Sequence, residues 1–217
     1  MSLDRRAALR AWWSFDGAGA GTRAFLLARL SIIPLDAMDR ELRDVRGRVL
    51  SVGCGHGVVE RYLAEINSNV SVVGAELDAD RVALAARSQH RYPAVEVRRE
   101  DARLLAGYGD FDAALAIDVL HHVAFEEQSE VARMMAASVG PGGFVLVKEM
   151  DVRPAWKYHW NRTHDRVVAK QWVNCRPPRE MAALFQAAGL VVERVERVDR
   201  PYGPYPQYVL RLRKPSA

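Results

Sequence analysis

The sequence has little of what stabilises extracellular or zinc-binding proteins. Its 217 residues include only two cysteines, Cys54 and Cys175, which lie far apart in the chain. This number and spacing exclude a disulfide scaffold and a zinc cluster, and they are typical of a reducing compartment. We therefore predict a cytoplasmic protein that holds no metal ion.

Long apolar runs are also missing. The longest apolar stretch near the N-terminus, residues 24–35, is interrupted by Arg29 and Pro34. A membrane-spanning helix needs about 20 consecutive apolar residues. Residues 1–10 carry charges where a secretory signal needs an apolar segment. The sequence thus predicts a soluble protein without a membrane span.

Basic residues are not concentrated anywhere in the chain. The 31 Lys and Arg residues are scattered and mostly offset by 27 acidic residues, which leaves a net charge of +4. A surface that follows a phosphate backbone needs a dense basic patch instead. The base-binding motif D/N-P-P-Y/F is absent as well. We therefore expect no nucleic-acid partner.

The middle of the chain alternates short β-branched runs with amphipathic helical patterns. The predicted strands cover 48–52, 70–75, 95–97, 113–117 and 144–147, and the predicted helices between them cover 58–66, 79–91 and 126–139. Such alternation is typical of a parallel sheet with right-handed crossovers. Pro141-Gly142-Gly143 is predicted to form a turn before the last of these strands.

The two ends of the chain differ from the middle. Residues 1–46 have helical patterns and are predicted to form a cap on a domain that covers 47–217, within a single-domain protein. Helices are also expected over 155–172 and 179–188. The last β-like runs, 190–198 and 207–213, have no helix between them, so we expect them to pair antiparallel.

A glycine-rich loop follows the first predicted strand. Gly53, Gly55 and Gly57 occupy alternate positions where the strand gives way to a helix. Glycine allows a tight turn and a close approach of the backbone to a ligand. The N–H groups at the start of the helix favour a carboxylate or phosphate by about 0.3–1 kcal/mol. The loop therefore predicts a ligand-binding turn.

Acidic residues follow the next three strands. Glu76 comes 19 residues after Gly57 at the end of the second strand, and Asp101 and Asp118 follow the third and fourth. A carboxylate at the tip of the second strand can accept both ribose hydroxyls of an adenosine group. Ligands of open α/β sheets bind beyond the carboxyl ends of the strands. These residues therefore indicate one nucleotide-like site.

Taken in order, these motifs resemble the class I methyltransferases that use S-adenosylmethionine (SAM), in particular the small-molecule enzymes of the type 11–12 group. The resemblance covers residues 47–150 and extends to 213. It implies an α/β Rossmann-like fold with a seven-stranded, mostly parallel sheet in the order 3-2-1-4-5-7-6 and helices on both faces. The SAM-binding residues that it implies are Ser51, Gly53, Cys54, Gly55, Gly57, Glu76, Leu77, Asp101, Ala102, Asp118 and Val119.

One position departs from the family pattern. Two residues before the first glycine the family often carries an Asp that helps to hold the amino group of the methionine moiety, and here this residue is Ser51. A hydroxyl can accept a hydrogen bond but carries no charge. The departure concerns the affinity for the cofactor more than the identity of the family.

The acceptor site is less well defined by the sequence. His121 and His122, after the fourth strand, are candidates for a general base or an acceptor contact, or for packing and capping. Substrate candidates are Lys148, Trp156, Trp160 and His164. The last three are spaced four apart on one helix face, which could line an acceptor pocket or pack the helix onto the sheet. We expect a small-molecule or lipid-like acceptor; its identity, the methylated atom and the oligomeric state stay open.

Two other functions share parts of this pattern. A nicotinamide-dependent dehydrogenase uses a similar loop and acid, but its G-x-G-x-x-G/A spacing would place Val58 at the third glycine site. A noncatalytic SAM-binding or regulatory module would keep the same cofactor site. The predicted activity is methyl transfer from SAM, with these two as the alternatives.

Overall fold

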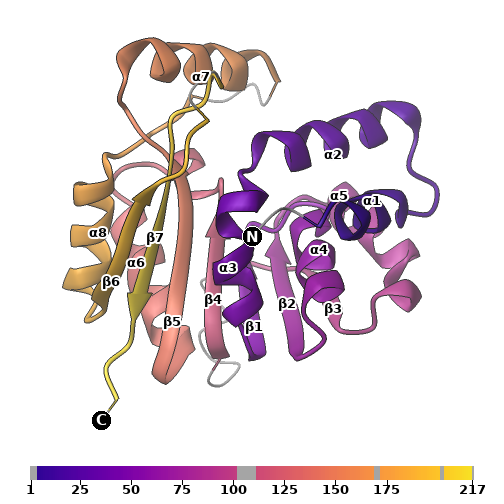
Figure 1. Ribbon diagram of the computed structural model, residues 1–217, viewed down its shortest axis with the longest axis horizontal. Helices are drawn as coiled ribbons and strands as arrows, with labels where there is room; N and C mark the ends of the chain where they lie inside the picture. The colour runs from indigo at the N-terminus through magenta and orange to yellow at the C-terminus, as the bar shows by residue number, and fades with distance from the viewer. Residues whose placement is uncertain (1–3, 102–110, 169–171, 201–202, 217) are drawn as a thin grey trace. The chain divides into compact units, whose positions relative to one another are not determined.

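The computed structural model of the chain describes residues 4–101, 111–168, 172–200 and 203–216. These residues form two compact units, 1–113 and 114–217. The strands form a seven-stranded sheet in the order β3-β2-β1-β4-β5-β7-β6 (Figure 1). This order confirms the predicted Rossmann-like fold.

The first unit carries the N-terminal helices and the first three strands. Its elements are α1 (Arg5–Trp13), α2 (Ala20–Ile32), α3 (Leu35–Asp44), β1 (Gly47–Val52), α4 (Val58–Ile66), β2 (Val70–Glu76), α5 (Ala79–Arg87), η1 (Gln89–Arg91) and β3 (Val95–Arg99). β1 pairs parallel with β2, and β2 pairs parallel with β3. Val52 lies opposite Ala75 in this register, so the loop after β1 begins beside the end of β2.

The helix predicted over 79–91 is interrupted in the structure. α5 ends at Arg87, and Ser88 adopts a φ of −116° before a short 3₁₀ turn continues the chain. The Ser88 hydroxyl accepts a hydrogen bond from the buried Arg61 guanidinium at 2.9 Å. A contact between distant parts of the chain therefore accompanies the end of this helix.

The second unit contains the rest of the sheet. β4 (Phe111–Ile117) runs across the boundary, and the following elements are η3 (Leu120–His122), α6 (Gln128–Ser138), β5 (Val139–Met150), α7 (Ala155–Val168), α8 (Pro178–Ala187), β6 (Val191–Arg197) and β7 (Gln207–Arg213). β7 pairs antiparallel with both β5 and β6, which confirms the predicted antiparallel pairing of the last two strands. In Figure 1, α8 lies beside β6 and α7 follows the carboxyl end of β5.

The prediction of a turn at Pro141-Gly142-Gly143 was wrong. These residues belong to β5, which already begins at Val139. Gly142 has a φ of +76°, and its amide donates to the Lys214 carbonyl at 3.0 Å, while the Lys214 amide donates to Gly143. Pairing with the segment after β7 therefore extends the strand through a sequence that alone favours a turn.

The core of the first unit explains why the N-terminal helices pack there. Ala7 and Ala11 of α1 and the following Phe15 are fully buried. α1 contacts α4, whose buried side chains include Tyr62 and Leu63. Small residues on α1 let the two helices approach closely. Whether residues 1–46 cap an acceptor stays a prediction.

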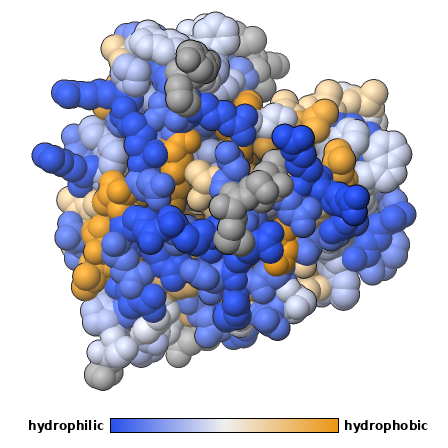
Figure 2. Space-filling view, in the orientation of Figure 1, coloured by the Kyte–Doolittle hydropathy of each residue, from blue (hydrophilic) through white to orange (hydrophobic). Residues whose placement is uncertain are grey.

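Hydrophobic side chains at the surface are scattered. On the face shown in Figure 2 they form small patches between charged and polar residues, as is usual for globular proteins. Among the helices that the structure describes, none is both long and apolar enough to cross a bilayer.

Candidate cofactor and acceptor site

The loop between β1 and α4 has the backbone conformation that its glycines predict. Gly53, Gly55 and Gly57 have φ values of +60°, +62° and +80°, which lie in the left-handed region that favours glycine. A Cβ on Gly57 would also lie 2.9 Å from Cγ2 of Val97. Side chains are therefore excluded at these three positions by backbone strain and, at Gly57, also by contact.

Glu76, at the end of β2, adjoins this loop as predicted. Its Oε2 atom accepts a hydrogen bond from the amide of Gly55 at 2.8 Å. Its Oε1 atom accepts from the amides of Leu77 and Asp78 at 2.8 and 2.9 Å. The Glu76 side chain is mostly buried, and Arg81 lies 3.7 Å away. The acid is thus held in one position beside the glycine loop.

A pocket of about 280 Å³ opens between α2 and this loop. Its lining residues are Gly21, Thr22, Phe25, His56 and Arg81. Burial, followed by the charges of Arg81 and Arg29, lowers the pKa of His56 to about 4. The imidazole is therefore neutral at pH 7, and its ring lies 5.8 Å from that of Phe25. The volume is close to the lower end of the range of small-molecule sites, about 300–1,000 Å³.

The other predicted cofactor residues of this unit differ in their surroundings. Cys54 is buried, burial raises the pKa of its thiol, and a Cβ on Gly74 would lie 2.5 Å from its sulfur, so Cys54 is an unreactive packing residue. Leu77 is 67% exposed beside the loop, which leaves its side chain available to a ligand. Asp101 is partly buried, and Ala102 lies outside the described residues.

In the second unit, the loop after β4 begins with a strained residue. Asp118 has a φ of +56°, the only positive value at a described non-glycine residue. Such a conformation costs about 1–3 kcal/mol and is typical of functional sites. The Asp118 carboxylate forms an ion pair with the fully buried Lys148 of β5, and its amide donates to the Lys148 carbonyl at 2.9 Å. Lys148 was predicted to contact the substrate, but its ammonium group is buried and paired with Asp118.

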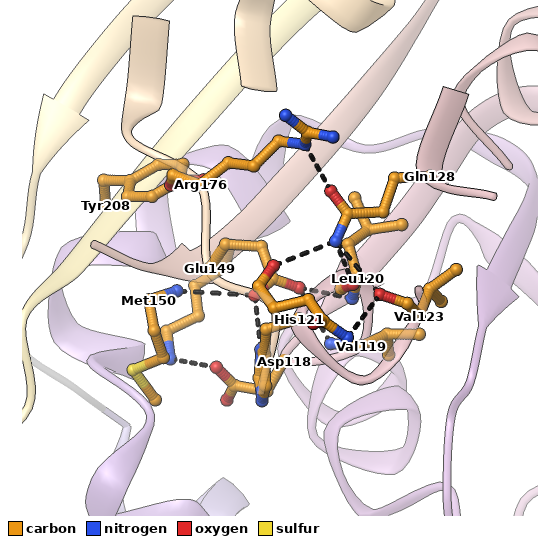
Figure 3. A network of polar contacts seen from close by, with 12 residues as sticks. Asp118, Val119, Leu120, His121, Val123, Gln128, Glu149, Met150, Arg176 and Tyr208 are labelled. Atoms are coloured by element: carbon orange, nitrogen blue, oxygen red, sulfur yellow. Dashed lines mark hydrogen bonds and ion pairs between the residues drawn. The ribbon is translucent and has the colours of Figure 1, made fainter. Parts of the chain in front are cut away.

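Glu149 of β5 fixes the rest of this loop. Figure 3 shows its carboxylate pointing toward the loop backbone and His121. It accepts hydrogen bonds from the amides of Val119 and Leu120 at 2.9 and 2.6 Å and contacts Nδ1 of His121 at 2.5 Å. Burial alone would raise the pKa of Glu149, but the charge and hydrogen bond of His121, with the Val119 amide, lower it on balance. The carboxylate is therefore ionised at neutral pH.

Gln128 of α6 also holds the loop after β4, by donating hydrogen bonds to backbone carbonyls of that loop (Figure 3). Its side-chain amide donates to the carbonyls of Leu120, Val123 and Asn174 at 3.0, 3.1 and 2.9 Å. Its Oε1 atom accepts from Nε of Arg176 at 2.7 Å. Gln128 was missed by the sequence analysis, and Glu149 was given no role by it. The available signal was a charged residue next to Lys148 in an otherwise apolar strand.

The two histidines of this loop have different environments. His121 is buried against Glu149, whereas His122 is exposed. Their ring centroids are 4.1 Å apart. Only His122 therefore combines a place in this loop with an accessible imidazole.

The predicted acceptor face on α7 is largely open to solvent. Trp156 and Trp160 are 58% and 55% exposed, so these two rings do not pack the helix onto the sheet. The ring centroids of His164 and Tyr205 are 5.6 Å apart. The helix instead buries Lys157, whose ammonium forms an ion pair with Asp199.

The comparisons with known proteins agree with this arrangement. A family model described as a methyltransferase domain matches residues 25–195. The chain is 30% identical over 148 residues to a ubiquinone biosynthesis O-methyltransferase from Caulobacter sp. (strain K31), covering 64% of this chain and 58% of that protein. It is 28% identical over 156 residues to a protein of the same name from Xanthomonas axonopodis pv. citri, covering 70% and 62%.

Solved structures share the fold. An O-methyltransferase family protein from Burkholderia thailandensis superposes with a TM-score of 0.66 at 23% identity, covering 91% of this chain and 61% of that one. The 1,6-didemethyltoxoflavin-N1-methyltransferase of the same organism, solved with S-adenosylhomocysteine, gives 0.67 at 18% identity, covering 97% and 89%.

The sheet order, the glycine loop and the acid at the end of β2 are together typical of Rossmann-like proteins. With the family match over most of its length, the chain belongs to the class I SAM-dependent methyltransferase family. It spans 58% and 62% of the two curated relatives named above.

Proposed function

We propose that this chain transfers a methyl group from SAM to a hydroxyl group of a small-molecule or lipid-like acceptor. The observation that carries the proposal is the hydrogen bond between the Gly55 amide and Glu76, which holds an acid beside a loop with three glycines in the left-handed region. A buried carboxylate fits the paired hydroxyls of a ribose, and the start of α4 fits an anionic group.

The residues proposed to hold the cofactor are those that the family resemblance implies. Glu76 binds the ribose, and Leu77, Asp101 and Ala102 surround the adenine. The glycines at 53, 55 and 57 let the backbone of the loop approach the cofactor. Ser51, Cys54, Asp118 and Val119 complete the proposed set.

When bound, SAM supplies a methyl group that its cationic sulfur already activates. The chain has to orient the acceptor and to take up the proton of its hydroxyl group as the new bond forms. We propose His122 for this proton, because its imidazole is exposed on the loop after β4. His121, held by Glu149, is then a positioning residue that fixes the loop and contacts the tilted ring of His122.

Oxygen is proposed as the methylated atom because the two curated relatives are named O-methyltransferases in ubiquinone biosynthesis. Trp156, Trp160 and His164 stay the proposed acceptor contacts, and the exposed tryptophans suit an aromatic or lipid-like molecule. Lys148 is proposed to act through Asp118.

Calorimetry and a product assay test this function. SAM and S-adenosylhomocysteine should bind and NAD should not, and Glu76→Ala should weaken SAM binding by about tenfold or more. Incubation with SAM and panels of phenols, amines and lipids, read by mass spectrometry, should give methylated phenols. Binding of NAD without SAM would favour the dehydrogenase, and SAM binding with no product from any panel would favour a noncatalytic module.

A further inference from the structure

Ser51 contacts a carboxylate of the neighbouring helix α4. The Ser51 hydroxyl, in β1, donates a hydrogen bond to Oε1 of Glu60 at 2.6 Å. Glu60 lies in the first turn of α4, three residues after Gly57, and both side chains are buried. The carboxylate of Glu60 thus lies next to Ser51, although β1 itself has no acidic residue.

The second oxygen of this carboxylate is unsatisfied. Within the described part of the chain, Oε2 of Glu60 is buried and has no hydrogen-bond partner. A buried charged acceptor that is left unpaired has lost its hydration without gaining a partner, which is unfavourable. Native structures retain such groups mainly where a ligand, ion or water completes them.

The charges around Glu60 do not provide that partner directly. Burial raises the pKa of Glu60, and the Ser51 hydrogen bond and the charges of Arg29, on α2, and Arg61 lower it only in part. The Arg61 guanidinium itself donates to Ser14, Ser88 and the Ala85 carbonyl. A cationic ligand group would therefore stabilise the ionised form of Glu60.

We propose that Glu60 holds the α-ammonium group of the methionine part of SAM, in place of the acid that the family often carries at the position of Ser51. This inference rests on the proposed SAM site and assigns one more residue to it. An ammonium group donates up to three hydrogen bonds, and Oε2 of Glu60 accepts one of them. Ser51 then orients the carboxylate through Oε1.

Two ligands separate this role from a purely structural one. S-adenosylhomocysteine carries the amino group, whereas 5′-methylthioadenosine carries the adenosine and a thioether but no amino acid part. Glu60→Gln should weaken the binding of S-adenosylhomocysteine by about 10- to 100-fold in calorimetry. The affinity for 5′-methylthioadenosine should stay unchanged. Glu65→Gln, on the same helix and paired with Arg10 and Tyr92, is the matched control and should alter neither affinity.

An exchange of the two residues provides the rescue. The double variant Ser51→Asp/Glu60→Ser returns the carboxylate to the strand and should recover most of the affinity for S-adenosylhomocysteine. Wild-type affinity in Glu60→Gln, or an equal loss for both ligands, would overturn the proposal. If Glu60→Gln does not fold, the exchange decides: recovered affinity supports the role, and binding of 5′-methylthioadenosine alone refutes it.

A separate variant, Glu76→Ala, tests the proposed SAM site independently of Glu60. Glu76→Ala should weaken the binding of both ligands, because both contain the ribose. If Glu76→Ala no longer binds either ligand and Glu60→Gln binds both with wild-type affinity, the proposed SAM site is supported and the role of Glu60 is refuted. If the wild-type protein binds neither ligand, both the proposed SAM site and the role of Glu60 are refuted.

Discussion

Truncation of Arg61 should destabilise the first unit more than removal of any exposed arginine. The Arg61 side chain is buried in the middle of α4. Its guanidinium donates to the hydroxyls of Ser14 and Ser88 at 2.7 and 2.9 Å and to the Ala85 carbonyl at 2.9 Å. It also lies 3.9 Å from the centre of the Phe15 ring. One side chain thus connects α4 to the segment after α1 and to the end of α5.

The magnitude follows from opposing contributions. Three hydrogen bonds to a charged donor contribute about 4–5 kcal/mol at the low end of their range. Burial lowers the pKa of Arg61 from 12.5 to about 10, so holding the charged form inside the unit costs about 3 kcal/mol. Lost packing of the long side chain adds about 2 kcal/mol to the effect of truncation. Arg61→Ala should therefore lower the free energy of unfolding by about 3–4 kcal/mol.

Thermal and urea unfolding measure this loss. For a chain of this length, it corresponds to a fall in Tm of about 6–16 °C. Arg6→Ala, on the exposed side of α1, is the control and should change stability by about 0.5 kcal/mol at most. An Arg61→Ala protein that unfolds with the wild-type midpoint would refute the reasoning, because burial and three hydrogen bonds would then contribute nothing net.

Three further predictions concern the site. Gly57→Ala should destabilise the chain by about 1–3 kcal/mol in urea unfolding, because its φ is +80° and the new Cβ meets Val97; Gly19→Ala, with open space around it, is the control and should be nearly neutral. Glu149→Gln should lower stability at pH 7. Because the pKa of Glu149 is lowered in the folded chain, its contribution is complete above pH about 5 and is lost as pH falls through the folded value, so the difference from wild type should shrink in acid; a pH-independent difference would contradict this. His122→Ala should lower kcat by about 10²–10⁴-fold without changing the affinity for S-adenosylhomocysteine, and full activity would exclude it as the base.

The sequence predicts those parts of the fold that local patterns specify. α4 and β7 have the predicted bounds, and the other strands except β5 begin and end within two residues of their predicted ranges. The glycines at 53, 55 and 57 and the acid at the end of β2 adjoin as expected, because strand, turn and helix fix their geometry over a short stretch of chain.

The buried polar residues could not be predicted in this way. Glu60, Arg61 and Glu149 are charged residues in segments whose pattern alone gives them no partner, and each is stabilised by groups from other elements. The error at Pro141 has the same cause, since the partner that extends β5 lies after β7. Where a contact spans the chain, the local composition of either segment is not informative.

The loops after β1 and after β4 are therefore stabilised by different means. The loop after β1 depends on glycines whose φ values no other residue adopts easily, so its shape is a local property of the backbone. The loop after β4 contains a strained Asp118 and is held by the side chain of Glu149, 28 residues beyond the histidine that it contacts. A substitution that keeps the glycines but removes Glu149 should consequently leave the cofactor loop intact and release the histidine loop. The conformations of the two loops are thus separable by mutation, because each depends on its own set of contacts.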